Sequence, residues 1–250
     1  SNDELKNAVT KKPFLGFSDT TLNHFMLHKV GLPTFYGQAF LPDVCELAPE
    51  MLPYTKRYFE EFLKTGTIRE VRPSELWYTS RTDFSPEALG TELPAHKNTG
   101  FELLQGPAQF EGEILGGCID SMYEMFSGWR YGDMPEVCRN YGLFPSMDDW
   151  RGKILLMESC EEYMPPETYK KALETLQETG VFDAVSGVLV GKPMDDMYHA
   201  EYKKLLVSII ANKELPILCN INVGHAQPRC ILPFGVPAHV DADAQVIRFG

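Results

Sequence analysis

Ser18 belongs to the first of three segments that could supply the groups of a nucleophilic hydrolase. In this segment, over 13–21, a short apolar run passes into a predicted helix over 20–29. A serine at such a turn exposes its hydroxyl group, and the first N–H groups of the helix can stabilise an oxyanion. Ser18 or Asp19 could instead only cap the helix, since both are favoured N-cap residues. Thr20 stands where an esterase turn of the G-x-S-x-G type has its second glycine.

Glu158 could supply the carboxylate of such a site. It directly follows four apolar residues that predict a buried strand over 153–157. Ligands and catalytic groups collect at the carboxyl ends of strands in open α/β sheets. A carboxylate there can hold a histidine in one tautomer and stabilise its protonated form. The alternative is a solvated acidic turn that Glu158 forms with Glu161 and Glu162.

His225 is the third candidate group. It lies between Gly224 and Pro228, after a predicted strand over 216–220, so a tight loop is expected to hold it. A neutral imidazole is the commonest general base for a serine hydroxyl. The alternative is a structural histidine whose hydrogen bonds are satisfied within the loop.

Other reactive residue types form weaker patterns. Cys160 and Cys219 lie close to the proposed segments and leave a cysteine nucleophile open as an alternative. His24 and His28 are four residues apart on one predicted helix but lack the glutamate of an H-E-x-x-H zinc motif. His199 follows two aspartates, which favours a solvated helix start over a cation site. The sequence also lacks a glycine-rich phosphate loop, and we expect neither a metal nor a cofactor.

Composition and charge exclude several classes of protein. The net charge of −12 and the pI of about 5.0 argue against nucleic-acid or anionic-membrane binding, which needs positive charge. No apolar run approaches the ~18 residues of a membrane helix. The six cysteines contain no CxxC pair and predict buried free thiols in a reducing compartment, hence a cytoplasmic protein. Only seventeen residues precede Ser18, so we expect an upstream portion to be missing.

Helical and strand-like patterns alternate along the chain and predict an α/β fold. We expect helices over 20–29, 49–64, 167–179 and 198–211 and one starting at 119, with strands over 153–157, 187–190, 217–220, 231–234, 238–240 and 246–249. We divide the chain into three parts: residues 1–70 as the remainder of a nucleophile-bearing α/β domain, 71–109 as a long active-site loop region, and 110–250 as a mixed α/β, β-rich C-terminal domain carrying Glu158 and His225.

Taken in order, these segments resemble the LD-carboxypeptidase family of serine peptidases, which includes peptidases that give immunity to microcin C. The resemblance extends from about residue 11 to the end of the chain. It rests on several short motifs: GFSDTT over 16–21, the glycine pair at 116–117, the strand ending at 158, the stretch 180–192, and the Gly-His loop at 224–225 followed by LPFG over 232–235.

The resemblance implies the chemistry of a Ser–Glu–His triad. Ser18 would be the nucleophile, His225 the general base and then acid, and Glu158 the partner that orients the histidine. The backbone N–H of Asp19 would supply one oxyanion donor. The family takes its second donor from a glycine upstream of the nucleophile, within a Rossmann-like α/β portion of which this chain would hold only a part.

The family also suggests how a substrate is held. Gly116, Gly117 and Cys118 correspond to its glycine pair and to a following asparagine, which is cysteine here. Trp77 lies in the long loop region and could stack on a nucleobase or only anchor the loop. The family cleaves either a peptidoglycan stem tetrapeptide or an aminoacyl nucleotide of the microcin C type, and is commonly dimeric. The loop region favours the immunity branch slightly. A catalytically impaired member that only binds small molecules is the alternative.

Overall fold

An eight-stranded mixed sheet is the centre of the protein, in a computed structural model that describes residues 2–9 and 12–250. Four neighbouring strands run parallel in the order β7, β8, β9, β10, and antiparallel strands extend the sheet at both ends. The sheet contains, from edge to edge, β3 (Glu70–Val71), β13 (Val246–Phe249), β12 (Pro237–Asp241), β7 (Gln109–Cys118), β8 (Ile154–Glu158), β9 (Gly187–Gly191), β10 (Ile217–Ile221) and β6 (Glu102–Gln105).

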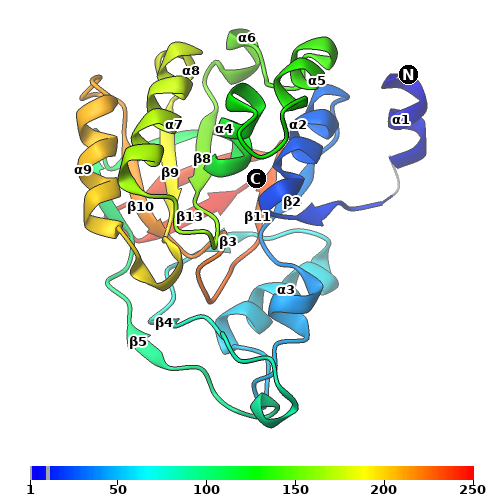
Figure 1. Ribbon diagram of the computed structural model, residues 1–250, viewed down its shortest axis with the longest axis vertical. Coiled ribbons are helices and arrows are strands. Elements are labelled where there is room, and N and C mark those ends of the chain that lie inside the picture. Colours follow the sequence, from blue (N-terminus) through cyan, green and yellow to red (C-terminus); the bar gives the residue numbers. More distant parts are fainter. Residues whose placement is uncertain (1, 10–11) are drawn as a thin grey trace.

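The parallel strands are connected through helices that pack against the sheet. Figure 1 shows α4, α7 and α9 side by side on the face turned toward the viewer. In α7 the buried residues Tyr169, Ala172, Leu173 and Leu176 recur at the spacing of one helical face, which explains why this segment docks as a helix. The helices of this body are α2 (Thr21–Lys29), α4 (Ile119–Ser127), α5 (Met134–Tyr141), α6 (Met147–Trp150), α7 (Pro166–Glu178), α8 (Val181–Ala184) and α9 (His199–Ile209).

Two smaller sheets complete the fold. The first joins β1 (Leu15–Gly16), β2 (Thr34–Tyr36) and β11 (Leu232–Phe234), so a strand near the C-terminus pairs with the segment that precedes Ser18. The second is the pair β4 (Leu76–Tyr78) and β5 (Ala95–Lys97), which lies with α3 (Pro53–Thr65) below the main body in Figure 1. The helix α1 (Asn2–Val9) stands at the side of the molecule.

The α/β fold class predicted from the sequence is confirmed, and most predicted elements lie within a few residues of the observed ones. The sequence did not predict several short elements, among them β2, α5 and the strands β4, β5 and β6. Near the C-terminus, β12 and β13 extend the main sheet from β7. Within 2–9 and 12–250, no helix is both long and apolar enough to cross a membrane.

The cysteines differ in part from the prediction. All six are free thiols, and five of them are buried as expected. Cys45 is exposed, which corrects the expectation that every thiol is buried. Cys45 directly follows a short π-helix over Phe40–Val44, outside the sheets, so no neighbouring strand covers its side chain.

The central strand β8 should be the part of the core most sensitive to truncation. Leu156 is completely buried between neighbouring strands. We expect Leu156→Ala to lower the free energy of unfolding by about 2–5 kcal/mol, because it removes buried methyl groups and leaves a cavity. Leu63→Ala on α3 is the control: its side chain is 67% exposed, and the change should stay within about 0.5 kcal/mol. Urea denaturation measures both, and equal losses would contradict this view of the core.

Candidate active site

Ser18 lies at a sharp turn directly after β1. The turn is a 3-10 helix over Ser18–Thr20 that leads into α2, and Ser18 has a φ of 62°. A non-glycine residue in this left-handed region is strained, as in the nucleophile turns of hydrolases. The Oγ of Ser18 lies 3.0 Å from Nε2 of His225. The backbone thus presents the hydroxyl group to the imidazole, as the sequence pattern suggested.

Glu158 holds the other side of the imidazole. Its Oε2 lies 2.7 Å from Nδ1 of His225 and also accepts the backbone N–H of His225 at 3.3 Å. The carboxylate side chain is fully buried, and that of His225 is 7% exposed. Two hydrogen bonds from one residue to one carboxylate fix the ring orientation and place the protonated nitrogen of a neutral imidazole at Nδ1.

Two glycines allow the histidine loop to reach Glu158 across β9. A Cβ on Gly191, at the end of β9, would lie 2.7 Å from both the Cβ of Glu158 and the carbonyl oxygen of Val223. A Cβ on Gly224, which has a φ of 90°, would lie 2.3 Å from Oε2 of Glu158. Both positions therefore require glycine, because any side chain would push the loop away from the carboxylate.

Tyr36 connects the serine turn to Glu158 and was not predicted from the sequence. Its hydroxyl donates to Oε1 of Glu158 at 2.6 Å and accepts the backbone N–H of Ser18 at 3.0 Å. Burial and the neighbouring charge of Glu158 raise the pKa of Tyr36 well above its usual value, so the phenol stays protonated. No local motif marks Tyr36, because its role depends on the pairing of β2 with β1.

Arg229 holds the loop that carries His225, and it was also missed. The guanidinium donates to the carbonyl oxygens of Gly224 and His225 and pairs with Asp43 at 2.9 Å. It also lies over the ring of Phe17, 5.0 Å from the centroid. Asp43 comes from a distant segment, so sequence spacing could not reveal this buried ion pair.

A second carboxylate touches the imidazole. Oε2 of Glu161 lies 3.0 Å from Nε2 of His225, the nitrogen that also faces Ser18. Burial alone would lower the pKa of His225, but the charge of Glu158 and the hydrogen bonds to Glu158 and Glu161 outweigh it and raise that pKa to about 10. The same hydrogen bond lowers the pKa of Glu161 to about 2. Both carboxylates thus favour the protonated form of the His225 ring.

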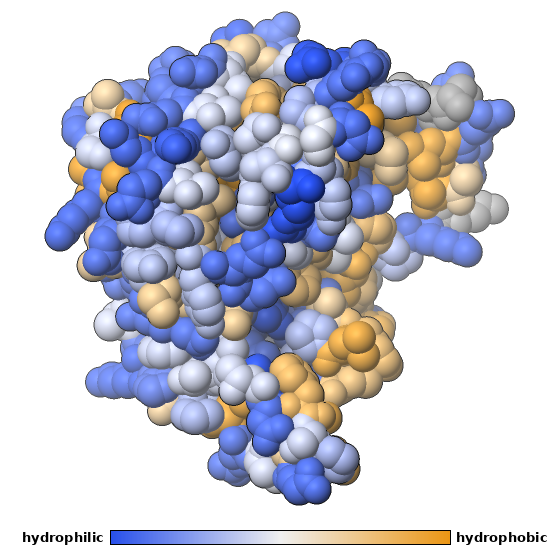
Figure 2. Space-filling view, in the orientation of Figure 1, coloured by the Kyte–Doolittle hydropathy of each residue, from blue (hydrophilic) through white to orange (hydrophobic). Residues whose placement is uncertain are grey.

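A cavity of about 700 Å³ opens above these residues. Ser18, His225 and Glu161 line it together with Leu41, Phe84 and other residues of the 41–47 and 80–84 loops. Leu41 and Phe84 are about three-quarters exposed, and Figure 2 shows apolar surface in the lower right part of the molecule, over the region of α3 and its neighbouring loops. The mouth of the cavity is therefore largely apolar.

Two polar atoms in this cavity are buried without a hydrogen-bond partner among the described residues. They are Oγ of Ser80 and Oε1 of Gln227. A buried polar atom without a partner costs about 1–3 kcal/mol, which a ligand or water could recover. Both are thus candidates for polar contacts to a bound molecule.

The remaining predicted residues lie around this site in different ways. Gly116, Gly117 and Cys118 end β7 beneath the serine turn, where a Cβ on Gly117 would lie 2.4 Å from Oγ1 of Thr21 and the N–H of Cys118 donates to that oxygen. They are buried and are not among the residues lining the cavity. The side chain of Asp19 lies 3.6 Å from Arg130, and Asp19 is not among the residues lining the cavity. Substrate contacts at 116–118 stay a prediction.

Trp77 lies on β4, in the predicted loop region. Its ring stacks on His96 with centroids 4.1 Å apart, and Nζ of Lys192 lies 4.9 Å from its centroid. The next residue, Tyr78, pairs with Gln227 of the histidine loop. Trp77 thus packs against His96 and Lys192 beside the site and is not among the residues that line the cavity, so its contact with a substrate stays a prediction.

The alternative chemistries gain no support from the geometry. Burial raises the pKa of Cys219, which disfavours a thiolate nucleophile there. His24 is buried between Thr34 and Gly16, and burial lowers its pKa to about 4. Over the described ranges, no group of three or more His, Cys, Asp or Glu side chains could hold a metal ion.

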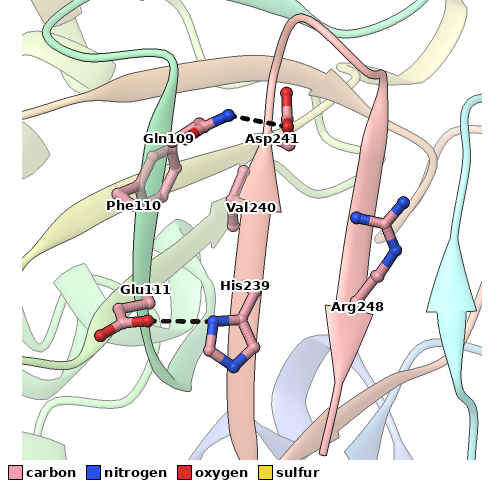
Figure 3. Close-up of a pocket in the computed structure, with 7 residues that line it drawn as sticks. All are labelled: Gln109, Phe110, Glu111, His239, Val240, Asp241 and Arg248. Carbon is pink, nitrogen blue, oxygen red and sulfur yellow. Dashed lines mark hydrogen bonds and ion pairs between the residues drawn. The ribbon is translucent and has the colours of Figure 1, made fainter.

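A second cavity, of about 350 Å³, lies on the antiparallel strands β7, β12 and β13 (Figure 3). Four of its polar side chains form two pairs: Gln109 donates to Asp241, and His239 faces Glu111 at 3.0 Å. Its lining residues contain neither serine nor cysteine. It therefore offers no nucleophile, and the cavity at Ser18 is the candidate active site.

The chain belongs to the LD-carboxypeptidase family. A sequence model described as the LD-carboxypeptidase C-terminal domain matches residues 111–240. The structure superposes with a TM-score of 0.97 on an MccF-like protein from Streptococcus pneumoniae, solved in complex with AMP, which is 58% identical and covers 100% of this chain and 73% of that one.

More distant relatives are named as peptidases or immunity proteins. The microcin C7 self-immunity protein MccF of Escherichia coli is 26% identical over 95% of this chain, and a putative carboxypeptidase of Vibrio cholerae is equally similar. The chain spans 65% and 66% of the lengths of these two relatives. A solved structure of MccF with aspartyl sulfamoyl adenosine, 23% identical with a TM-score of 0.74, shares the fold.

The charge on His225 can be tested directly. Its pKa is raised above the ordinary value of 6.5, so the resulting stabilisation is complete below about pH 6.5 and is lost as pH rises through about 10. We expect Glu158→Gln to move the pKa of His225 down toward 6.5, because a neutral amide no longer favours the imidazolium. NMR titration of the imidazole measures this shift.

Glu111→Gln is the matched control for that titration. Glu111 pairs with His239, a half-exposed histidine in the second cavity, and does not contact His225. Its replacement should leave the titration of His225 unchanged. An unshifted His225 in Glu158→Gln would show that the buried carboxylate does not set the charge of the ring.

Proposed function

We propose that this protein is a serine-type amide hydrolase in which Ser18 is the nucleophile, His225 the general base and acid, and Glu158 the residue that orients the imidazole. One observation carries the proposal. Oγ of Ser18, both nitrogens of His225 and the carboxylate of Glu158 form a continuous hydrogen-bonded chain, with contacts of 3.0 and 2.7 Å. Each contact is within the reach that proton transfer requires.

In the proposed reaction Ser18 attacks the carbonyl carbon of an amide while Nε2 of His225 takes the hydroxyl proton. The imidazolium then gives that proton to the departing amine, and water hydrolyses the acyl-enzyme by the reverse sequence. Glu158 stabilises the imidazolium in both steps without becoming protonated. The backbone N–H of Asp19, directly after the strained Ser18, is the proposed oxyanion donor.

The proposed substrate is a small peptide or an aminoacyl nucleotide. A cavity of about 700 Å³ is of the size that small ligands occupy. Phe84 lines the cavity and is 74% exposed, so it offers an aromatic face to a base. The ring of Trp77 instead stacks on His96 and lies near Lys192. The related MccF-like protein that binds AMP favours the aminoacyl-nucleotide class for this chain. A homodimer and a cytoplasmic location stay predictions.

The first test replaces the nucleophile. We expect Ser18→Ala to lower kcat by about three to six orders of magnitude, since the members of a triad act as a unit. The substrates are a stem tetrapeptide ending in D-Ala and aspartyl sulfamoyl adenosine, with products read by mass spectrometry. Ser208→Ala, on the exposed side of α9, is the control and should keep full activity.

The products distinguish the possible functions. Serine-dependent release of D-Ala would indicate a carboxypeptidase of cell-wall peptides, and cleavage of the adenylate alone would indicate a detoxifying peptidase. Cleavage of neither, together with failure of a fluorophosphonate to label Ser18, would favour a protein that binds small molecules without turnover.

Tyr36 should act as a positioning residue. We expect Tyr36→Phe to lower kcat about tenfold to hundredfold with little change in KM, because the turn of Ser18 and the carboxylate of Glu158 both lose a fixed partner. Tyr58→Phe is the matched control: Tyr58 is also fully buried and its hydroxyl accepts a backbone N–H, but from Arg72. Comparable losses of stability with unequal losses of kcat would support the role of Tyr36, and equal kcat would refute it.

A further inference from the structure

Glu161 and Ser18 compete for one nitrogen of His225. The carboxylate Oε2 and the serine Oγ each lie 3.0 Å from Nε2. A charged acceptor binds an imidazolium N–H more strongly than a hydroxyl does, so Glu161 is the preferred partner while the ring is protonated. A nitrogen that carries a proton cannot accept one from Ser18. The contact between Glu161 and Nε2 therefore belongs to a resting state of the site. Turnover requires that Glu161 release Nε2.

Glu161 also lines the cavity, and among the described residues it makes no ion-pair contact with a lysine or arginine. The charge of Arg130 helps to lower the pKa of Glu161 without such a contact. The cations nearby have other partners. Arg81 pairs with Glu46 at 2.5 Å and Arg229 with Asp43 at 2.9 Å. Arg130 pairs with Glu162 at 2.9 Å. Across the residues the structure describes, the ion pair of Glu161 is with His225 alone. Its side chain is 60% exposed and lines the cavity. A ligand can therefore reach it.

We propose that Glu161 is a specificity-determining residue that binds a protonated primary amine on the acyl residue of the substrate and thereby frees Nε2 of His225 to act on Ser18. The inference rests on the proposed hydrolase function. The ammonium replaces the imidazolium as the partner of Glu161, and the proton of Nε2 passes to solvent water. Glu161 is paired with one positive charge before and after the exchange, first the imidazolium and then the ammonium. The Nε2 that has lost its proton can then accept the proton of Ser18.

Both proposed substrate classes contain such an amine. An aminoacyl nucleotide has the free α-amino group of its acyl residue. In a stem tetrapeptide, the residue before the terminal D-Ala is lysine or diaminopimelate, whose side chain ends in an amino group. Because Nε2 must come within about 3 Å of the scissile bond, a carboxylate that touches Nε2 lies within reach of a group a few bonds away.

Binding without turnover is the first readout. In the Ser18→Ala protein, calorimetry compares aspartyl sulfamoyl adenosine with its N-acetylated form, and a lysine-containing stem tetrapeptide with its side-chain-acetylated form. We expect the free amine of at least one pair to bind at least tenfold more tightly. Adding Glu161→Gln should bring that ratio close to one, because the amide cannot neutralise an ammonium group.

Glu162→Gln is the matched control for Glu161→Gln. Glu162 is the adjacent carboxylate, but it pairs with Arg130 at 2.9 Å. The substitution Glu162→Gln should therefore leave the preference for the free amine unchanged. Equal preference in the Glu161→Gln and parent proteins, or no preference for the amine in either pair, would overturn the proposal even if the hydrolase assay succeeds.

The reactivity of Ser18 gives a second readout that needs no substrate. We expect a fluorophosphonate to label Ser18 at least threefold faster in Glu161→Gln than in the wild type at pH 7, because Nε2 is no longer held by a carboxylate. Glu162→Gln should label at the wild-type rate. Slower labelling in Glu161→Gln would contradict the resting role of the contact, whereas absence of labelling in every variant would contradict the hydrolase function itself.

Discussion

The buried contact between Glu158 and His225 determines how the rest of this protein is arranged. A fully buried carboxylate is costly unless charge or hydrogen bonds compensate it. Here Nδ1 and the backbone N–H of His225 and the hydroxyl of Tyr36 all point at it. The same contacts fix the ring, the histidine loop and the serine turn relative to one another. The hydrogen bonds to Glu158 therefore both stabilise this part of the fold and position the side chains of the candidate active site.

The fold brings these groups together because the three-stranded sheet contacts β7 of the main sheet through β11. Glu158 ends a central parallel strand, where the carboxyl ends of neighbouring strands collect polar groups. Ser18 follows β1 of the three-stranded sheet, and β11 of that sheet comes from the segment directly after the histidine loop. The loop crosses the end of β9 because Gly191 and Gly224 leave room for it. Packing of the two sheets thus sets the distance between nucleophile and base.

The electrostatics describe a site at rest. His225 lies between two carboxylates, which favour its protonated form, and the nearby arginines are already paired with other carboxylates. A bound molecule that changes the partners of Glu161 changes the protonation of the base at the same time. Recognition and activation would then be one event at one nitrogen atom, with no rearrangement of the fold.

The sequence by itself predicted the α/β class and most of the longer elements, because apolar periodicity is a local property. It offered Ser18, Glu158 and His225 as candidates through the order of short motifs that resemble the family's. It could not determine Tyr36, Asp43 or Arg229, whose contacts join segments far apart in the chain. Nor could it show that Glu161 reaches Nε2, where the sequence suggested only an acidic turn. Hydrogen bonds and ion pairs depend on distances that arise only when the sheets pack, so the tertiary structure decided them.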